Sequence, residues 1–228
     1  MNLKVLGSSS KGNCYILTNE NEALIIEAGI PLLEVKKALS FDVRKIVGVV
    51  VSHFHGDHAI YVEQYRKVGI SVFDAYRLCE INNGKVGKFV MGNFIIDTFP
   101  LIHDVPCYGY LIAHPEMGKL LFATDTEYVK YRFKNLNHIL IEANYDKKYL
   151  SKLDAKRKHV LEGHMSIDTA ERFINANKTG LLQNVVLLHL SSDGSNPKEF
   201  RNRIQNITNA DVNIATKGLE INLDLVPF

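Results

Sequence analysis

Three histidines and an aspartate stand close together in the run His53–His58, which reads H-F-H-G-D-H. Imidazole nitrogens and carboxylate oxygens are ligands that zinc and similar divalent metals accept. A turn can aim the alternate residues His53 and His55 at one metal while Asp57 and His58 face a second. The chain has nine histidines in 228 residues, so an ordinary surface turn would rarely collect them in this way. The run therefore predicts a metal site.

The metal-ligand run directly follows residues 46–51, an apolar stretch with three consecutive valines. A continuous apolar stretch of this kind is typical of a strand that is covered on both faces. Short apolar stretches separated by turn residues predict further strands. With residues 46–51, the predicted strands are 3–6, 14–18, 23–27, 70–74, 88–91, 94–102, 107–113, 119–123, 138–142, 185–190, 212–215 and 219–223.

Four segments have the apolar spacing of helices, and they stand between the predicted strands. They are residues 31–39, 59–68, 166–177 and 197–207. Many strands in each half with helices between them predict an α/β sandwich with the helices outside. No internal repeat and no linker rich in Pro, Gly or Ser divides the chain, so a single domain over residues 1–228 is the economical interpretation.

Composition excludes several classes of protein. Hydrophobic residues make up 46% and charged residues 23%, which are ordinary globular values, and the net charge is +2. No apolar stretch reaches the length of a membrane span, and no signal peptide is evident. Cys14, Cys79 and Cys107 form no C-x-x-C pair, which argues against a disulfide framework or a thiolate zinc site. We therefore expect a soluble, cytoplasmic protein.

The H-x-H-x-D-H run after an apolar strand resembles the metallo-β-lactamase superfamily, and specifically its two-metal hydrolase branch. The resemblance implies an α/β fold, the αββα four-layer sandwich. It also implies three more ligands at the ends of later strands, and His103, Asp125 and His189 match them. By the same analogy, His53, His55 and His103 hold one divalent ion, Asp57, His58 and His189 hold the other, and Asp125 bridges them. Zn²⁺ is the first expectation, with Mn²⁺ as the alternative.

Two further segments carry this resemblance. The loop at residues 7–13, which reads G-S-S-S-K-G-N, is similar to a loop near the active site of phosphodiesterase-type members, so Ser10 and Asn13 are candidates for binding substrate. Its simpler interpretation is an ordinary hairpin loop. The chain departs from the usual Asp-Ala-Gly at Glu27, a position that supports the metal loop rather than binding the metal.

The pair Glu142 and His164 discriminates between branches of the superfamily. It is similar to the pair that transfers a proton to the leaving oxygen in tRNase Z-like enzymes, so His164 is the predicted general acid and Glu142 its orienting partner. Asp57 is the third predicted catalytic residue. Ser166 is a candidate for touching substrate, although capping the helix that follows is the simpler role. A metal-bound water together with a proton donor predicts phosphodiester hydrolysis.

The sequence leaves more than one class of substrate open. The compact chain is similar to phage and bacterial members that include anti-Pycsar cyclic-nucleotide phosphodiesterases, which favours small 3′,5′-cyclic nucleotides, a homodimer and a bacterial or phage anti-defence setting. The basic stretch 147–158 favours instead a single-strand or RNA-processing nuclease of the WalJ/YycJ or tRNase Z type. That stretch is also readable as a solvated helix face. A non-catalytic binding protein ranks last, because all seven predicted ligands are present.

Overall fold

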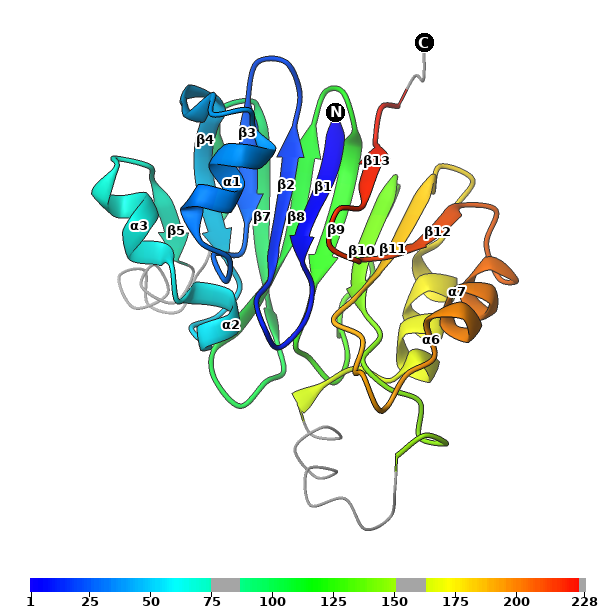
Figure 1. The fold of residues 1–228 in the computed structure, drawn as a ribbon. Coiled ribbons are helices and arrows are strands. Elements are labelled where there is room, and N and C mark those ends of the chain that lie inside the picture. Colours follow the sequence, from blue (N-terminus) through cyan, green and yellow to red (C-terminus); the bar gives the residue numbers. More distant parts are fainter. Residues whose placement is uncertain (75–86, 151–162, 226–228) are drawn as a thin grey trace.

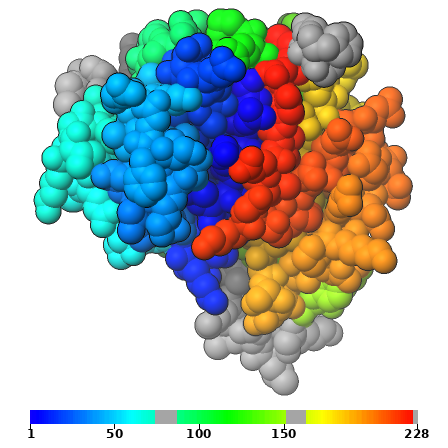
Figure 2. Space-filling view, turned by 45° about the horizontal axis from the view of Figure 1, so that its top comes forward, coloured from blue at the N-terminus to red at the C-terminus, as the bar shows by residue number. Residues whose placement is uncertain are grey.

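Two β-sheets form the centre of the computed structural model, which describes residues 1–74, 87–150 and 163–225 (Figure 1). The six-stranded sheet has the order β13-β1-β2-β3-β4-β5. Its strands are β1 (Asn2–Gly7), β2 (Cys14–Thr18), β3 (Ala23–Ile26), β4 (Ile46–Val51), β5 (Val72–Asp74) and β13 (Glu220–Asn222). Figure 2 shows the red C-terminal segment against the blue N-terminal strand, where β13 pairs antiparallel with β1.

The second sheet has seven strands in the order β12-β11-β10-β9-β8-β7-β6. Its strands are β6 (Phe89–Met91), β7 (Phe94–Leu101), β8 (Cys107–His114), β9 (Gly118–Ala123), β10 (His138–Glu142), β11 (Asn184–Leu188) and β12 (Asp211–Ile214). Strands β9 to β12 run parallel, as do β3, β4 and β5 in the first sheet. Because parallel strands end at the same edge of a sheet, residues that follow them are brought together.

Helices cover the outer face of each sheet (Figure 1). The first sheet carries α1 (Leu32–Ala38), the 3₁₀ helix η1 (Val43–Lys45), α2 (Gly56–Ala59) and α3 (Val62–Lys67), and the second carries α6 (Ile167–Asn177) and α7 (Pro197–Gln205). Separate apolar clusters lie under each helical layer, and a third lies between the sheets. The αββα sandwich predicted from the sequence is therefore confirmed.

One predicted helix differs in the structure. Residues 59–68 were expected to continue as one helix, but the chain breaks between α2 and α3 at Ile60 and Tyr61. The carbonyl oxygen of His58 accepts a hydrogen bond from the Ala28 amide at 2.7 Å, and the Ala28 carbonyl accepts one from the Tyr61 amide at 3.0 Å. These bonds to the segment after β3 replace the bonds that a continuous helix would make.

Two of the three cysteines lie within the described residues. Cys14 and Cys107 are buried and free, and Cys79 lies outside the described residues. Among the described residues, no helix is both long and apolar enough to cross a bilayer.

Tyr110 joins the two sheets through the core. Its buried hydroxyl, on β8, donates a hydrogen bond of 2.5 Å to the carbonyl oxygen of Val51, at the end of β4. Tyr110→Phe removes this donor, and we expect it to lower the free energy of unfolding by about 1–2 kcal/mol. Urea unfolding measures the change. The matched variant Tyr131→Phe, at a side chain that is 41% exposed, should change stability little. Equal effects of the two variants would contradict this role for the Tyr110 hydroxyl.

Candidate metal centre

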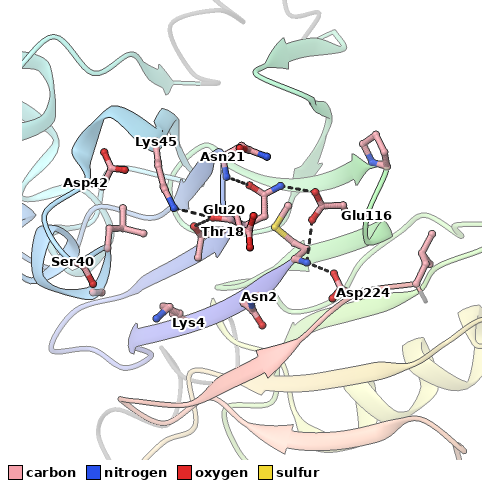
Figure 3. A pocket seen from close by; sticks show the side chains of 16 residues that line it. Asn2, Lys4, Thr18, Glu20, Asn21, Ser40, Asp42, Lys45, Glu116 and Asp224 are labelled. Atoms are coloured by element: carbon pink, nitrogen blue, oxygen red, sulfur yellow. Dashed lines mark hydrogen bonds and ion pairs between the residues drawn. The ribbon is translucent and has the colours of Figure 1, made fainter. Parts of the chain in front are cut away.

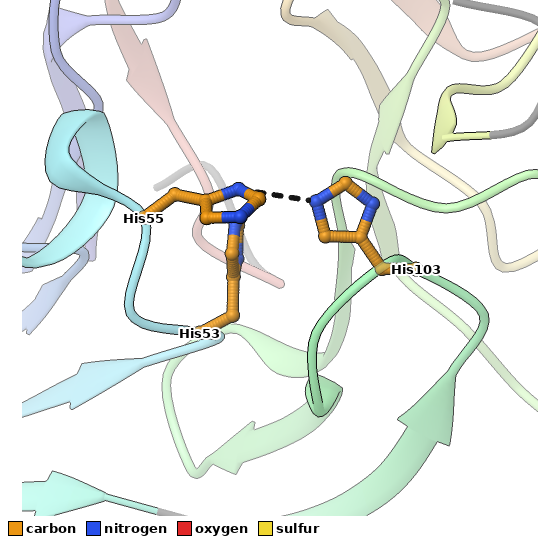
Figure 4. Close-up of side chains that lie close together, drawn as sticks. All are labelled: His53, His55 and His103. Carbon is orange, nitrogen blue, oxygen red and sulfur yellow. Dashed lines mark hydrogen bonds between the residues drawn. The ribbon is translucent and has the colours of Figure 1, made fainter. Parts of the chain in front are cut away.

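His53, His55 and His103 face one another across two loops (Figure 4). The first two follow β4, and His103 follows β7. Ring centroids lie 4.7 Å apart for His53 and His55, and 4.9 Å apart for His53 and His103. Nδ1 of His55 and Nε2 of His103 are 3.3 Å apart. The three rings can therefore offer one nitrogen each to a single ion.

Asp57, His58 and His189 form a second group. Oδ2 of Asp57 lies 3.3 Å from Nε2 of His58 and 3.5 Å from Nε2 of His189. His189 comes from the end of β11, in the other sheet. The sandwich therefore brings together ligands that are more than a hundred positions apart in the chain.

Asp125, directly after β9, lies against the second group. Its Oδ2 is 2.7 Å from Nε2 of His58, and its Oδ1 is 3.4 Å from Nδ1 of His189. Asp125 also shares a possible metal-binding group with His53 and His58, which places it between the two sets of ligands. All seven predicted ligands thus come together; their assignment as ligands stays a prediction.

Three site residues adopt left-handed backbone conformations at the ends of strands. Glu27 has a φ of 69°, Asp125 of 49° and His189 of 52°. Non-glycine residues rarely adopt this region, and where they do, surrounding contacts must hold them. The left-handed conformation turns the chain at the end of each strand, so that each side chain points across the edge of its sheet toward the cluster. It also explains why the strands predicted at 23–27 and 185–190 end at Ile26 and Leu188.

Buried imidazole nitrogens test whether the cluster suits a metal. Nε2 of His53, Nδ1 of His58 and Nε2 of His189 are buried and make no hydrogen bond to any described residue. Burying such polar atoms without a partner is costly. A divalent ion at each group would bind Nε2 of His53 and Nε2 of His189, and Nδ1 of His58 has the Glu27 carboxylate 3.4 Å away. The donor set therefore fits divalent metal.

The protonation states also suit metal binding. Burial, together with the nearby His58, lowers the pKa of His53 to about 2, so its ring is neutral and its lone pairs are available. Burial alone would raise the pKa of Asp125, but His189 and His58 hold it well below its usual value. Asp57 likewise has a lowered pKa despite its partial burial, because the His189 and His58 rings lie beside its carboxylate. Both carboxylates are therefore ionised.

Residues behind the ligands fix their orientation. The Asn13 Nδ2 group donates to Oδ2 of Asp57 at 3.2 Å and lies 3.0 Å from Nε2 of His58. The Asn13 side chain is fully buried beside these two residues, and its role in binding substrate stays a prediction. Glu27, which replaces the usual Asp, accepts hydrogen bonds from the Ser52 amide and still reaches His58.

Three positioning residues were not predicted. The Ser52 hydroxyl lies 2.8 Å from Nδ1 of His53, and the Ser8 hydroxyl accepts a hydrogen bond of 2.9 Å from the His189 amide. The Asn144 Nδ2 group donates to the His189 carbonyl oxygen at 2.8 Å. Ser8 and Asn144 carried a signal in the sequence, because Ser8 stands in the loop 7–13 and Asn144 stands two positions after Glu142; Ser52 carried none.

Glu142 and His164 meet at the same edge of the second sheet. Nδ1 of His164 lies 2.7 Å from Oε1 of Glu142 and 3.0 Å from Oδ1 of Asp125. Burial lowers the pKa of His164, but these carboxylates outweigh burial and raise it to about 10. Oε2 of the fully buried Glu142 accepts hydrogen bonds from the amides of Thr126 and Met165. Glu142 is therefore a fixed acceptor for the His164 ring.

The two predicted substrate-binding serines have different surroundings. The Ser166 hydroxyl accepts a hydrogen bond from the Thr169 amide at 3.2 Å and caps α6, and Ser166 also lines a cavity beside His164. Ser10 is exposed in the loop between β1 and β2. Its contact with substrate stays a prediction.

A cavity of about 1020 Å³ lies away from the cluster. It opens beside the β2–β3 turn at Glu20 and Asn21 and the β8–β9 turn at Glu116 (Figure 3). The Asn19 amide group donates to Glu116 at 2.7 Å, and Lys45 donates to the Asn19 carbonyl oxygen. No possible metal-binding group within the described residues includes a residue of this cavity. The cavity is therefore separate from the metal centre.

Gly29 allows the segment after β3 to approach the metal loop. A β-carbon at Gly29 would stand 1.7 Å from the Asp57 carbonyl oxygen, whereas one at Gly56 would meet nothing within 4 Å. Gly29→Ala must displace Asp57, and we expect at least about 10-fold weaker metal binding, as for other losses of ligand support. Elemental analysis after dialysis measures bound metal, with Gly56→Ala as the matched control. Equal metal content in both variants would argue against this constraint.

Comparisons with known proteins agree with the geometry. Residues 9–69 match the family model for the Metallo-beta-lactamase superfamily. The exodeoxyribonuclease YycJ of Bacillus anthracis is 24% identical, with 88% of this chain and 86% of that protein covered. The exodeoxyribonuclease WalJ of Streptococcus pneumoniae serotype 2 is 25% identical, with 92% and 89% covered.

Solved structures share the fold. The metallo-beta-lactamase fold protein YhfI from Bacillus subtilis superposes with a TM-score of 0.71 at 19% identity, covering 96% of this chain and 98% of that one. The short form of human tRNase Z gives 0.66 at 15% identity, covering 98% and 99%. The family match over residues 9–69, the shared fold and the clustered His and Asp side chains together support a hydrolase with a metallo-β-lactamase fold.

Proposed function

We propose that this chain is a metal-dependent phosphodiesterase that cleaves single-stranded nucleic acid, with His164 as the general acid. One observation carries the proposal: the contact between His164 and Glu142 lies directly beside the metal-ligand cluster, 3.0 Å from Asp125. A site that hydrolyses phosphodiesters must stabilise charge on the phosphate and protonate a leaving alkoxide. The described residues offer a group for each task.

The metal ligands are proposed as two sets. His53, His55 and His103 would hold one ion, Asp57, His58 and His189 the other, and Asp125 would contact both. When bound, such ions lower the pKa of a water molecule and neutralise charge on the phosphate. The count of two and the choice of Zn²⁺ over Mn²⁺ belong to this proposal, since histidine and carboxylate ligands suit both metals.

The chain's own residues handle the protons. The Glu142 carboxylate, fixed by two backbone amides, accepts the hydrogen bond from Nδ1 of His164. The proton to be donated is therefore the one on Nε2, on the opposite side of the ring, and His164 is one of the residues that line a cavity beside the cluster. The Asp57 side chain is 22% exposed and faces the solvent side of the cluster, where it can accept a hydrogen bond from the attacking water.

A nucleic acid strand is a better-supported substrate than a cyclic nucleotide. The relatives named exodeoxyribonucleases align over 86–89% of their own length, so the resemblance is not limited to the metal motif. Exposed aromatic side chains also lie near the cluster: Phe54 is 48% exposed and Tyr128 43%. Such rings stack on the bases of single strands. The ranking from sequence, which placed 3′,5′-cyclic nucleotides first, is therefore reversed.

Other expectations remain predictions. The structure describes only residues 147–150 of the basic stretch 147–158, because residues 151–162 lie outside the described residues. Lys147 and Lys148 are the cations of the described part. The homodimer and a phage origin, both taken from family analogy, stay predictions, and so does the cytoplasmic location expected from the composition and the cysteines.

A substrate panel tests the function. We expect hydrolysis of bis(p-nitrophenyl) phosphate and of short single-stranded DNA or RNA, lost after chelation and restored by Zn²⁺ or Mn²⁺. The same protein should leave 3′,5′-cyclic nucleotides largely intact. Chromatography of the products measures the hydrolysis of each substrate. The variant Asp125→Asn, which loses a predicted metal ligand, controls for contaminating nucleases. If the protein cleaved cyclic nucleotides and left the single strands intact, cyclic nucleotides would be the better-supported substrate.

A leaving-group comparison tests His164. An alkoxide leaving group needs a proton and p-nitrophenolate does not, so His164→Ala should slow cleavage of a dinucleotide by about 10²–10⁴-fold. The same variant should slow cleavage of a p-nitrophenyl ester far less.

Metal content is the control for this variant. His164 could itself join a possible metal-binding group with Asp125, Glu142 and His189. If His164→Ala lost metal, or slowed both substrates equally, His164 would be a ligand rather than the acid.

A further inference from the structure

A small cavity adjoins the cluster on the His164 side. Its volume is about 370 Å³, and its lining includes Glu127, Tyr128, Lys147, His164, Ser166 and Arg172. These residues come from the segment after β9, the segment after β10, and the beginning of α6. The cavity is therefore built by three separate elements of the second sheet and its helix.

Two cations of the lining lack carboxylate partners. Neither Lys147 nor Arg172 forms an ion pair with a described residue, and both side chains are exposed. Nearby cations behave differently: Lys148 pairs with Glu199, and Arg203 pairs with Asp168 and Glu171. Lys147 and Arg172 thus present two positive charges to the cavity, and Glu127 is the one acidic side chain among the described residues of its lining.

The backbone around Lys147 is anchored on both sides. Before it, the Asp146 amide donates to the Gly194 carbonyl oxygen at 2.8 Å. After it, Lys148 and the Tyr149 hydroxyl both bond to Glu199 on α7. Lys147 is therefore held beside the cavity by neighbours that make their own contacts elsewhere.

Arg172 is oriented from the first turns of α6. Its Nε donates to the Asp168 carbonyl oxygen at 3.2 Å, and its Nη2 to the Thr169 hydroxyl at 3.4 Å. These bonds draw the guanidinium toward the helix beginning, which Ser166 caps. Guanidinium and ammonium groups that converge from separate elements suit a phosphate oxygen.

We propose that this cavity binds the leaving nucleotide of a strand, with Lys147 and Arg172 contacting the phosphate next to the scissile one and Tyr128 stacking on the base. The inference rests on the proposed function, because the leaving side is defined by His164 as the proton donor. A cyclic mononucleotide carries one phosphate and has none to place here. The subsite therefore selects strands over cyclic nucleotides.

A neutral linkage tests this subsite. In a short single strand of DNA whose cleaved linkage has been mapped, the phosphate one position away on the leaving side is replaced by an uncharged methylphosphonate. For the wild-type chain we expect kcat/KM to fall about 10- to 100-fold, the value of one or two charge-assisted hydrogen bonds. In the double variant with Lys147→Ala and Arg172→Ala, the same replacement should cost less than about 3-fold.

Controls separate the outcomes. Lys130→Ala removes an exposed lysine near Tyr128 that does not line the cavity, and it should keep the full methylphosphonate penalty. A methylphosphonate on the other side of the cleaved linkage should give the same penalty in every variant. If the double variant kept the wild-type penalty on the leaving side, the subsite would be wrong while strand cleavage stood. If the wild-type chain cleaved no all-phosphate strand, the proposed function itself would fail, and the subsite with it.

Discussion

The Asp125 carboxylate lies buried between imidazole rings that come from other segments of the chain, His58 after β4, His164 before α6 and His189 after β11. Its ionised form depends on those rings, because burial alone would keep it protonated. The rings in turn depend on the sandwich, which closes two sheets so that their strand ends share one edge. Asp125 is therefore where the fold and the proposed chemistry depend on each other.

Support for the cluster comes from backbone contacts as much as from side chains. The Asn13 amide donates to the Asp57 carbonyl oxygen at 2.8 Å, and the Ala28 amide donates to that of His58 at 2.7 Å. These bonds interrupt the helix that the apolar pattern predicted after the metal loop. Tertiary hydrogen bonds that hold the loop therefore outweigh local helix propensity. The left-handed backbone of Glu27, Asp125 and His189 at three strand ends is a second case in which contacts at the site outweigh local conformational preference.

The two sides of the site have different surroundings. On one side the rings of His53, His55 and His103 lie close enough together to bind one ion, and the His53 ring is neutral. On the other side His164 meets a cavity lined by Lys147 and Arg172, whose positive charges have no carboxylate partner among the described residues. This division fits a reaction in which the phosphate is held at the cluster and the leaving part of the strand passes the basic cavity.

The sequence by itself determined the metal-ligand run, the strands that carry it and the αββα layering, because ligand types and apolar periodicity are local properties of the chain. It also pointed to Glu142 and His164 through a motif. Only the tertiary structure decided that Asn13 contacts Asp57 and His58, that Ser8 and Ser52 contact His189 and His53, and that Lys147 and Arg172 share a cavity. These roles depend on contacts between distant segments, which arise when the two sheets pack and leave no periodic trace in the sequence.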